Sequence, residues 1–494
     1  MPDPTGFLRH PRALPPRRPV PVRLRDWREV YDPAPEGLVH QQASRCMDCG
    51  IPFCHGACPL GNRIPDWNDL VRTGSWAAAA EALHATNNFP ELTGRLCPAP
   101  CEAACVLSIG GDDQAVTIKQ VEVEIADRAP FIPTPAANPS GRSVAVVGSG
   151  PAGLAAAQQL TRAGHQVTVY ERDDAPGGLL RYGIPDFKLD KRHLDRRLDQ
   201  LRGEGVRFRT GVDVGAGVCA AELRAGHDAV LLACGALRGR DTPGTPGRHL
   251  AGVHLAMEHL AGANRVVAGR AAGGEPPAAP VDAAGAHVVI IGGGDTAADC
   301  LGVAHRQGAA CVTQLDIYPH PPQARDAGRD PWPTWPWVLR TYPAHEEGGR
   351  REFAVAVQSF VDDGRGRVRA VRIAEVTVTG AGAGRVVTPV PGTGRDLPAD
   401  LVLLAIGFDG TDAGQALAQL GVATTGRGTV ECGPDWQTST GGVFVAGDAH
   451  RGASLVVWAI AEGRAAAASI HAYLGGAGQL PAPVTPVSAP LTVR

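Results

Sequence analysis

The sequence lacks the features that would place the chain at a membrane or on a nucleic acid. No apolar run approaches the roughly 20 residues that a membrane-spanning helix needs. The formal net charge of −3 excludes the strongly basic balance that is typical of nucleic-acid binding. Residues 1–28 are rich in Pro and Arg but lack the apolar centre of a signal peptide, so we interpret them as an extended arm. These absences predict a cytoplasmic protein without a membrane or nucleic-acid partner.

The twelve cysteines are distributed unevenly along the chain. Five are scattered through apolar segments and are expected to be small core residues. The other seven are clustered, at Cys46, Cys49, Cys54, Cys58, Cys97, Cys101 and Cys105. In a cytoplasmic protein this cluster predicts a soft metal centre rather than disulfides, because turns bring closely spaced thiolates to one point.

Zinc and iron–sulfur centres both use such cysteine spacings. Seven thiolates do not fill two four-cysteine sites, so zinc would need His55 as an eighth ligand. Iron–sulfur is favoured because the same chain carries two predicted sites for redox dinucleotides. If two clusters form, one ligand must be a side chain other than Cys.

The first dinucleotide site is predicted where an apolar run ends in G-x-G-x-x-G. Gly148, Gly150 and Gly153 allow a tight turn, close approach of a pyrophosphate and close packing of helix on strand. Glu171 ends the next strand and is expected to accept the ribose hydroxyls. This local pattern fits either FAD or a nicotinamide cofactor.

A second Gly-Asp turn far downstream favours FAD at the first site. Gly447 and Asp448 follow an apolar strand and precede a helix that opens near Leu455, whose positive end can face the flavin. The residues predicted to bind FAD are Gly148, Gly150, Pro151, Ala152, Gly153, Glu171, Gly178, Leu179, Lys188, Gly447, Asp448, Leu455 and Val456.

A second glycine-rich turn repeats the first unit and predicts the nicotinamide site. Asp316 stands where Glu171 stands in the first unit, and an acid there accepts the ribose of NADH. Arg325 is a candidate for the extra phosphate of NADPH, so both nucleotides stay possible. The predicted residues are Gly292, Gly294, Asp295, Thr296, Ala297, Asp316, Arg325 and Gly407. No acid–base residue is assigned, because hydride transfer needs alignment more than proton transfer.

The chain is expected to form an α/β protein with two Rossmann-like domains and a mainly α-helical N-terminal domain. Helices are predicted over residues 66–72 and 76–85, and antiparallel strands over 350–390. Residues 332–337 contain three Trp and are interpreted as a surface loop packed on its own tryptophans. The expected units are an iron–sulfur domain (1–139), an FAD domain in two parts (140–285 and 401–480), an NAD(P)H domain (286–400) and a tail (481–494).

Four segments resemble the small (beta) subunit of bacterial glutamate synthase. They are CMDCGIPFC from Cys46, PLGNRIPDWNDL from Pro59, ATNNFPE from Ala85 and CPAPCEAAC from Cys97, together with the two glycine turns. The resemblance covers nearly the whole chain. The same module looks like the N-terminal part of dihydropyrimidine dehydrogenase and the large subunit of electron-bifurcating transhydrogenases.

The resemblance implies that FAD accepts hydride from NADPH or NADH and passes single electrons through two 4Fe-4S clusters. The partner would be a large (alpha) subunit in a hetero-oligomer, which makes L-glutamate from L-glutamine and 2-oxoglutarate. Cys46, Cys49 and Cys54 would hold one cluster. Cys58, Cys97, Cys101 and Cys105 would hold the other. The missing ligand would be Glu122, with Gln120 as the alternative.

One departure from the family concerns the nucleotide. Many members carry arginines after the second-unit strand, where this chain has Gln314-Leu315-Asp316-Ile317. A second reading is an NAD(P)H:ferredoxin-type oxidoreductase with a different partner, and a third is a zinc-stapled nucleotide-binding adaptor. The sequence shows no glutaminase nucleophile arrangement and no evident 2-oxoglutarate site, so amide transfer is not expected on this chain.

Overall fold

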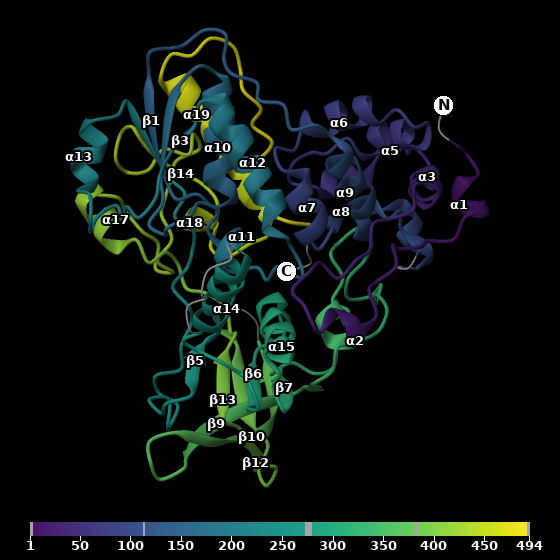
Figure 1. Ribbon diagram of the computed structural model, residues 1–494, viewed down its shortest axis with the longest axis vertical. Coiled ribbons are helices and arrows are strands. Elements are labelled where there is room, and N and C mark those ends of the chain that lie inside the picture. The colour runs from purple at the N-terminus through teal and green to yellow at the C-terminus, as the bar shows by residue number, and fades with distance from the viewer. Residues whose placement is uncertain (1–2, 112–113, 272–278, 381–383, 492–494) are drawn as a thin grey trace.

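The computed structural model describes residues 3–111, 114–271, 279–380 and 384–491, and its N-terminal domain is helical (Figure 1). The helices are α1 (Gly6–Arg9), α2 (Val20–Arg23), α3 (Glu36–Ser44), α4 (Phe53–Ala57), α5 (Ile64–Arg72), α6 (Trp76–His84), α7 (Pro90–Leu96), α8 (Pro100–Ala103), the 3-10 helix η1 (Val106–Gly110) and α9 (Ile118–Arg128). The two expected helices are α5 and α6. Most of the others are too short to show a helical period in sequence.

Helix α5 shows how this domain forms its core. Pro65 lies in the first turn, where its missing N–H costs nothing. Ile64, Trp67 and Val71 are spaced by three and four residues and are buried on one face. That face packs with residues of α3, α6 and α9 in one apolar cluster.

The first sheet has five parallel strands in the order β14-β4-β1-β2-β3. The strands are β1 (Ser143–Val147), β2 (Gln166–Tyr170), β3 (Arg207–Arg209), β4 (Ala229–Leu232) and β14 (Val443–Val445). Strand β14 comes from the end of the chain, yet Val443 lies opposite Val230 of β4. The expected interruption of the first domain by the second is therefore confirmed.

Alternate residues of β1 face two layers of helices. Val144 and Val146 join a core with α10 (Pro151–Arg162), α12 (Lys191–Glu204) and α19 (Val456–Tyr473). Ala145 and Val147 face the opposite core with α13 (Ala220–Ala225) and α17 (Gly414–Leu420). The short helices α11 (Leu179–Tyr182) and α18 (Asp448–Arg451) complete this domain. Within the described ranges, no helix combines the length and apolarity needed to cross a bilayer.

The second sheet is also parallel, in the order β5-β13-β6-β7-β8. Its strands are β5 (Val253–Leu255), β6 (His287–Ile291), β7 (Cys311–Leu315), β8 (Arg350–Glu352) and β13 (Leu401–Leu404). One face packs in a core with α14 (Ala256–Ala271), α15 (Asp295–Gln307) and α16 (Pro343–Glu346). Helix α14 ends at Ala271, and residues 272–278 after it lie outside the described ranges.

Antiparallel strands cover the other face of the second sheet. They are β9 (Val355–Asp362), β10 (Val368–Thr379), β11 (Val386–Pro389) and β12 (Arg395–Pro398). Val371 and Ile373 of β10 share a core with Val289 and Val402 of the parallel sheet. The antiparallel prediction for residues 350–390 is confirmed for β9 to β11. It is wrong for β8, which runs parallel to β7 with Arg350 opposite Thr313.

The Trp-rich loop does not pack on its own tryptophans, so that interpretation is wrong. The ring centroid of Trp332 lies 4.5 Å from that of Phe53 in the N-terminal domain. Trp335 packs under Arg340, and Trp337 packs under Arg329. The loop is docked on a separate domain, which the local sequence could not reveal.

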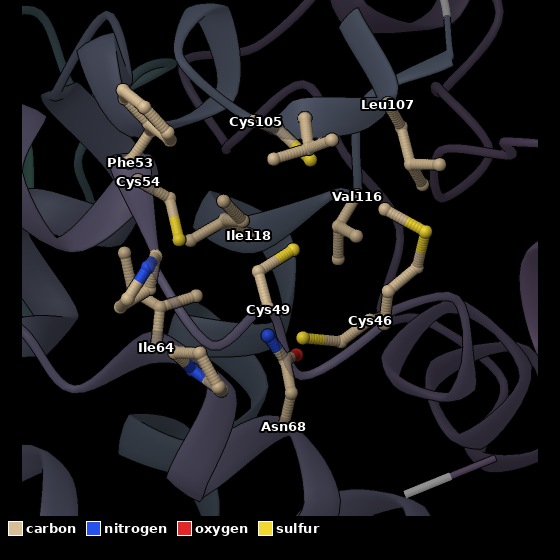
Figure 2. A pocket seen from close by; sticks show the side chains of 14 residues that line it. Cys46, Cys49, Phe53, Cys54, Ile64, Asn68, Cys105, Leu107, Val116 and Ile118 are labelled. Atoms are coloured by element: carbon tan, nitrogen blue, oxygen red, sulfur yellow. The ribbon is translucent and has the colours of Figure 1, made fainter. Parts of the chain in front are cut away.

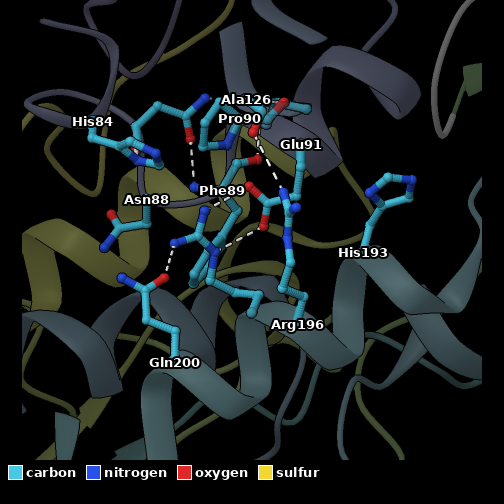
Figure 3. Close-up of polar contacts among 12 residues, drawn as sticks. His84, Asn88, Phe89, Pro90, Glu91, Ala126, His193, Arg196 and Gln200 are labelled. Carbon is cyan, nitrogen blue, oxygen red and sulfur yellow. Dashed lines mark hydrogen bonds and ion pairs between the residues drawn. The ribbon is translucent and has the colours of Figure 1, made fainter. Parts of the chain in front are cut away.

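The N-terminal domain and the FAD-type domain meet through a buried ion pair between α7 and α12 (Figure 3). Arg197 donates from Nε to Glu91 Oε1 at 2.8 Å and from Nη2 to Glu91 Oε2 at 2.7 Å. Nearby, Asn88 donates to Gln158 Oε1 at 2.7 Å and accepts from Arg464 at 2.6 Å. A bidentate pair of this kind fixes both position and orientation of the two helices.

Candidate functional site

The seven clustered cysteines line two separate cavities in the N-terminal domain. The first cavity is lined by Cys46, Cys49, Cys54 and Cys105, with apolar walls that include Phe53, Ile64, Leu107, Val116 and Ile118. Figure 2 shows sulfur atoms of this group directed toward one common space. The second cavity is lined by Cys58, Cys97, Cys101 and Glu122, together with Lys119 and Val457.

The expected division of the cysteines is corrected at one position. Cys105 was grouped with Cys58, Cys97 and Cys101, but it lies in the first cavity with Cys46, Cys49 and Cys54. That grouping is the one implied by the resemblance to the glutamate synthase small subunit. Helix α8, however, ends at Ala103, and Cys105 is extended with φ −58° and ψ 136°. The turn between them directs Cys105 to the other cavity.

Glu122 completes the second set of four donors, and not the set of Cys46, Cys49 and Cys54 that lacked a fourth ligand in the expected division. It projects from α9, is buried, and accepts a hydrogen bond on Oε1 from Asn87 Nδ2 at 2.8 Å and another from Thr93 Oγ1. Burial raises the pKa of Glu122 to about 7. Among the described residues that line the two cavities, neither the alternative Gln120 nor His55 is found.

The donor sets suit iron–sulfur clusters. All seven cysteines are free thiols, and burial raises the pKa of Cys46 and of Cys54 to about 12. Thiolate ligands at neutral pH therefore need the positive charge of iron beside them. Across the described ranges, no three His, Cys, Asp or Glu side chains meet in the arrangement that holds a single metal ion.

The first glycine turn has the geometry of a pyrophosphate site. A Cβ added to Gly148 would lie 2.4 Å from the Ala233 carbonyl oxygen, and one on Gly153 would lie 2.1 Å from that of Gly148. A Cβ on Gly150 would meet nothing within 4 Å, so the space above Gly150 is open to a ligand. A Cβ on Gly178 would lie 3.3 Å from Gly150 Cα, which brings Gly178 to the same turn. Pro151 and Ala152 begin α10 behind it.

Glu171 is buried at the end of β2, next to the first glycine turn. Its Oε2 accepts from the Ser149 backbone N–H at 3.1 Å, and its Oε1 accepts from that of Asp173 at 2.9 Å. The Ser149 hydroxyl in turn accepts from the Gly177 N–H at 2.8 Å. These contacts place the expected ribose-binding acid beside the turn.

The downstream Gly-Asp turn reaches the same site, as the sequence predicted. A Cβ on Gly447 would lie 2.7 Å from Ala152 Cβ, so this turn packs directly on α10. Burial raises the pKa of Asp448 to about 6, and its Oδ1 accepts from Ser454 Oγ at 2.7 Å. Leu455 caps α19 and Val456 begins it, beside this turn.

Glu462 was missed by the sequence analysis. It is buried on α19, accepts from the Gly447 N–H at 2.9 Å and pairs with Arg451 at 2.5 Å. It thereby fixes the backbone of the Gly-Asp turn. The available signal was a single acid within the otherwise apolar run 455–463.

The second glycine turn repeats this geometry at the carboxyl end of β6, the central strand of the second sheet. A Cβ on Gly292 would lie 2.2 Å from the Ala405 carbonyl oxygen, whereas one on Gly294 would meet nothing within 4 Å. Asp295, Thr296 and Ala297 form the first turn of α15. Asp316 lies over the turn, because a Cβ on Gly293 would stand 1.8 Å from its Oδ2.

Three further predicted residues have contacts that show where they lie. Lys188 Nζ lies 2.8 Å from Asp299 Oδ1 of α15, so Lys188 links the two nucleotide domains. The Gly407 carbonyl accepts from the Arg240 N–H at 2.9 Å. Arg325 donates to the carbonyls of Asp330, Thr334 and Ala103, the last in the N-terminal domain. These contacts give no support to the expected role of Arg325 at a 2′-phosphate.

Arg351 of β8 is a charged neighbour of Asp316 that the sequence analysis missed. Burial raises the pKa of Asp316, and the Arg351 charge lowers it in part. The two residues come together because β8 pairs with β7, a contact that local sequence does not show.

Comparisons with known proteins agree with this division of the chain. Residues 23–130 match the family described as dihydropyrimidine dehydrogenase domain II, 4Fe-4S cluster. Residues 142–329 and 365–463 match the pyridine nucleotide-disulphide oxidoreductase family. The first match supports iron–sulfur over zinc.

Individual proteins extend the comparison to the whole chain. A glutamate synthase (NADPH) small chain of Mycobacterium tuberculosis is 60% identical and covers 99% of this chain and 100% of its own length. A glutamate synthase (NADH) of Schizosaccharomyces pombe is 42% identical over 96% of this chain, which spans 23% of that protein. The structure of M. tuberculosis FprA in complex with NADPH has a TM-score of 0.52 at 22% identity, covering 69% of this chain and 85% of its own, and shows the shared fold.

The chain carries a 4Fe-4S domain and a flavin-type pyridine nucleotide domain, which make it an NAD(P)H-dependent oxidoreductase. It belongs to the family of glutamate synthase small chains.

Proposed function

We propose that this chain is the electron-input subunit of a glutamate synthase. NADPH or NADH binds at the Gly292 turn and reduces FAD held between the Gly148 turn and Asp448. Electrons then pass through one 4Fe-4S cluster in each cysteine cavity to a large subunit, which forms L-glutamate from L-glutamine and 2-oxoglutarate. The domain limits 1–139, 140–285, 286–400, 401–480 and 481–494 belong to this proposal, as does a reducing cytoplasmic compartment that keeps the thiols free.

A shared residue carries the proposal. Val457 lies in the first turn of α19, directly after the predicted flavin contacts Leu455 and Val456, and it also lines the second cysteine cavity. With Leu455 and Val456 assigned to the flavin, the flavin site and the second cavity share a wall. This arrangement supports an electron path from FAD to the second cavity and from there to the first.

The protein groups have distinct roles in this path. The open backbone at Gly150 and Gly294 admits the two pyrophosphates, and Glu171 and Asp316 accept ribose hydroxyls. The N-terminus of α19 presents its positive dipole end to the flavin. Bound FAD would supply the chemistry that converts a hydride into single electrons. Cys46, Cys49, Cys54 and Cys105 would hold one cluster, and Cys58, Cys97, Cys101 and Glu122 the other.

Two matched glycine variants test the assignment of the two nucleotides. Gly150 has φ −69° and Gly294 has φ −90°, and an added Cβ meets no protein atom within 4 Å at either position. Gly150→Ala and Gly294→Ala should therefore fold normally and act only by blocking a pyrophosphate. We expect Gly150→Ala to lose FAD. We expect Gly294→Ala to keep FAD but to be reduced slowly by NADPH and NADH, which are compared in parallel by stopped-flow absorbance.

The partner is tested with the complete enzyme. The full-length chain and the large subunit are purified anaerobically, and NAD(P)H-dependent glutamate formation is measured with the chain present or omitted. Glutamate formation that does not depend on this chain would contradict the proposal. Loss of FAD in Gly294→Ala with full FAD in Gly150→Ala would reverse the two nucleotide assignments.

A further inference from the structure

We propose that the loop 325–337 of the NAD(P)H domain shields the first cysteine cavity, with Trp332 as the positioning residue. The inference rests on the proposed function, because it takes the first cavity to hold a 4Fe-4S cluster. In this arrangement the nicotinamide domain protects a cluster carried by another domain.

Trp332 contacts the first cavity from outside in two ways. Its Nε1 donates to the carbonyl oxygen of Cys105 at 3.2 Å, so it holds the backbone of a cluster ligand. Its ring packs on Phe53, with 4.5 Å between centroids and 54° between planes. Phe53 lines the cavity and lies beside Cys54 in Figure 2. Trp332 thus packs behind Phe53 in the wall of the first cavity.

Arg325 fastens the loop to the same part of the N-terminal domain. Its Nη2 donates to the Ala103 carbonyl at 3.0 Å, two residues before Cys105. Its Nη1 donates to the carbonyls of Asp330 at 3.1 Å and Thr334 at 2.7 Å, on either side of Trp332. The carboxylate of Asp330 accepts from the Trp337 N–H at 2.8 Å. The loop therefore presents Trp332 in a fixed position.

The extent of the family matches supports a shielding role for the loop. The flavoprotein family matches residues 142–329 and 365–463, so Trp332 lies in an unmatched segment. The N-terminal 4Fe-4S domain, matched over residues 23–130, is likewise an addition to that fold. The added loop contacts the added domain at the wall of a cysteine cavity.

The first cavity needs such a cover because it lies close to the surface. Cys46, Cys49 and Cys54 are partly exposed, Phe53 is 37% exposed and Ile51 is 74% exposed. Dioxygen that reaches a 4Fe-4S cluster of charge 2+ takes one electron and becomes superoxide. The resulting 3+ cluster releases Fe²⁺ and leaves a 3Fe-4S cluster of charge 1+. A docked loop slows this reaction by limiting access.

The test compares Trp332→Phe, which loses the N–H donor, with Trp332→Ala, which also loses the ring. The full-length chain is purified anaerobically with its clusters and exposed to air, and Fe²⁺ release to a chelator is followed with the electron paramagnetic resonance signal of the 3Fe-4S product. We expect release about tenfold faster in Trp332→Ala, because a lost hydrogen bond and aromatic contact favour local opening of the loop. Trp332→Phe should fall between this variant and the unmodified chain.

Trp337→Ala is the matched control, because Trp337 packs on Arg329 in the same loop. All variants should keep their anaerobic iron, sulfide and FAD contents and their rate of FAD reduction by NAD(P)H. Equal Fe²⁺ release in Trp332→Ala and Trp337→Ala would overturn the shield. If Trp332→Ala does not fold, Trp332→Phe and Arg325→Gln decide in the same assay. A chain without iron under anaerobic conditions would instead contradict the proposed function.

Discussion

The two cysteine cavities differ in depth and in their fourth donor. The first has four cysteines, three of them partly exposed, and is backed by the Trp332 loop. The second has three buried cysteines and Glu122, and shares Val457 with the flavin helix. In the proposed function, similar cysteine motifs therefore serve different positions in one electron path, one beside the flavin and one nearer the surface.

The largest expected effect is the loss of a cysteine donor, and it distinguishes the two cavities. Cys58→Ala removes a donor of the second cavity, and Cys54→Ala one of the first. Both should lower glutamate formation by the complete enzyme at least about hundredfold, since loss of a ligand exceeds the usual cost of losing a neighbouring support. Only Cys54→Ala should still show a reduced cluster by electron paramagnetic resonance after NAD(P)H is added.

Flavin reduction by NAD(P)H is the control for both cysteine variants. It should continue in each, because both cavities lie after the flavin in the proposed path. A cluster that is reduced by NAD(P)H in Cys58→Ala but not in Cys54→Ala would reverse the proposed order.

A smaller effect is expected from the ion pair that supports the second cavity. Glu91 lies on α7, the helix that ends just before Cys97, and Arg197→Met leaves this carboxylate buried without its partner on α12. Breaking a buried pair in this way costs about 3–5 kcal/mol. The free energy of unfolding should fall in urea titrations, and iron should leave the second cavity before the first.

Arg202→Met provides the comparison on the same helix. Arg202 pairs with Asp199 at an exposed position, where such a pair contributes about 0–1 kcal/mol. Similar losses of stability in Arg197→Met and Arg202→Met would show that the buried pair does not anchor α7.

The smallest expected effect concerns the fourth donor, which is Glu122 in the second cavity and a cysteine in the first. Glu122→Gln replaces an anionic donor by a neutral one, while the amide oxygen can still accept from Asn87 and Thr93. Removing a negative charge favours the reduced cluster, so the potential of the second cluster should rise by about 60 mV, a tenfold step for one electron. A redox titration monitored by electron paramagnetic resonance measures this shift.

Glu124→Gln is the control for the charge effect. Glu124 lies on the same helix but pairs with Arg128 and accepts from the Ala34 N–H. An equal shift in Glu124→Gln would attribute the effect to overall charge rather than to a ligand.

Local sequence predicted the parts of the site that short segments determine. The glycine turns at Gly148 and Gly292 lie where their motifs indicated, because strand, turn and helix are consecutive there. The grouping of Cys105 was wrong because the end of α8 redirects the chain. The Arg197–Glu91 pair and the docking of Trp332 join residues more than 100 positions apart, and neither has a local signature.

The late return of β14 to the first sheet has a consequence for biosynthesis. Strand β4 leaves the ribosome about 210 residues before its neighbour β14, which is about 10–40 s at 5–20 residues per second. During that interval the side of β4 that later pairs with β14 has no strand beside it, and such unpaired edges promote aggregation. The nascent flavin domain therefore exposes this edge until β14 is made, and a chain truncated before residue 443 would lose the Gly-Asp turn, α19 and the Val457 wall of the second cysteine cavity together.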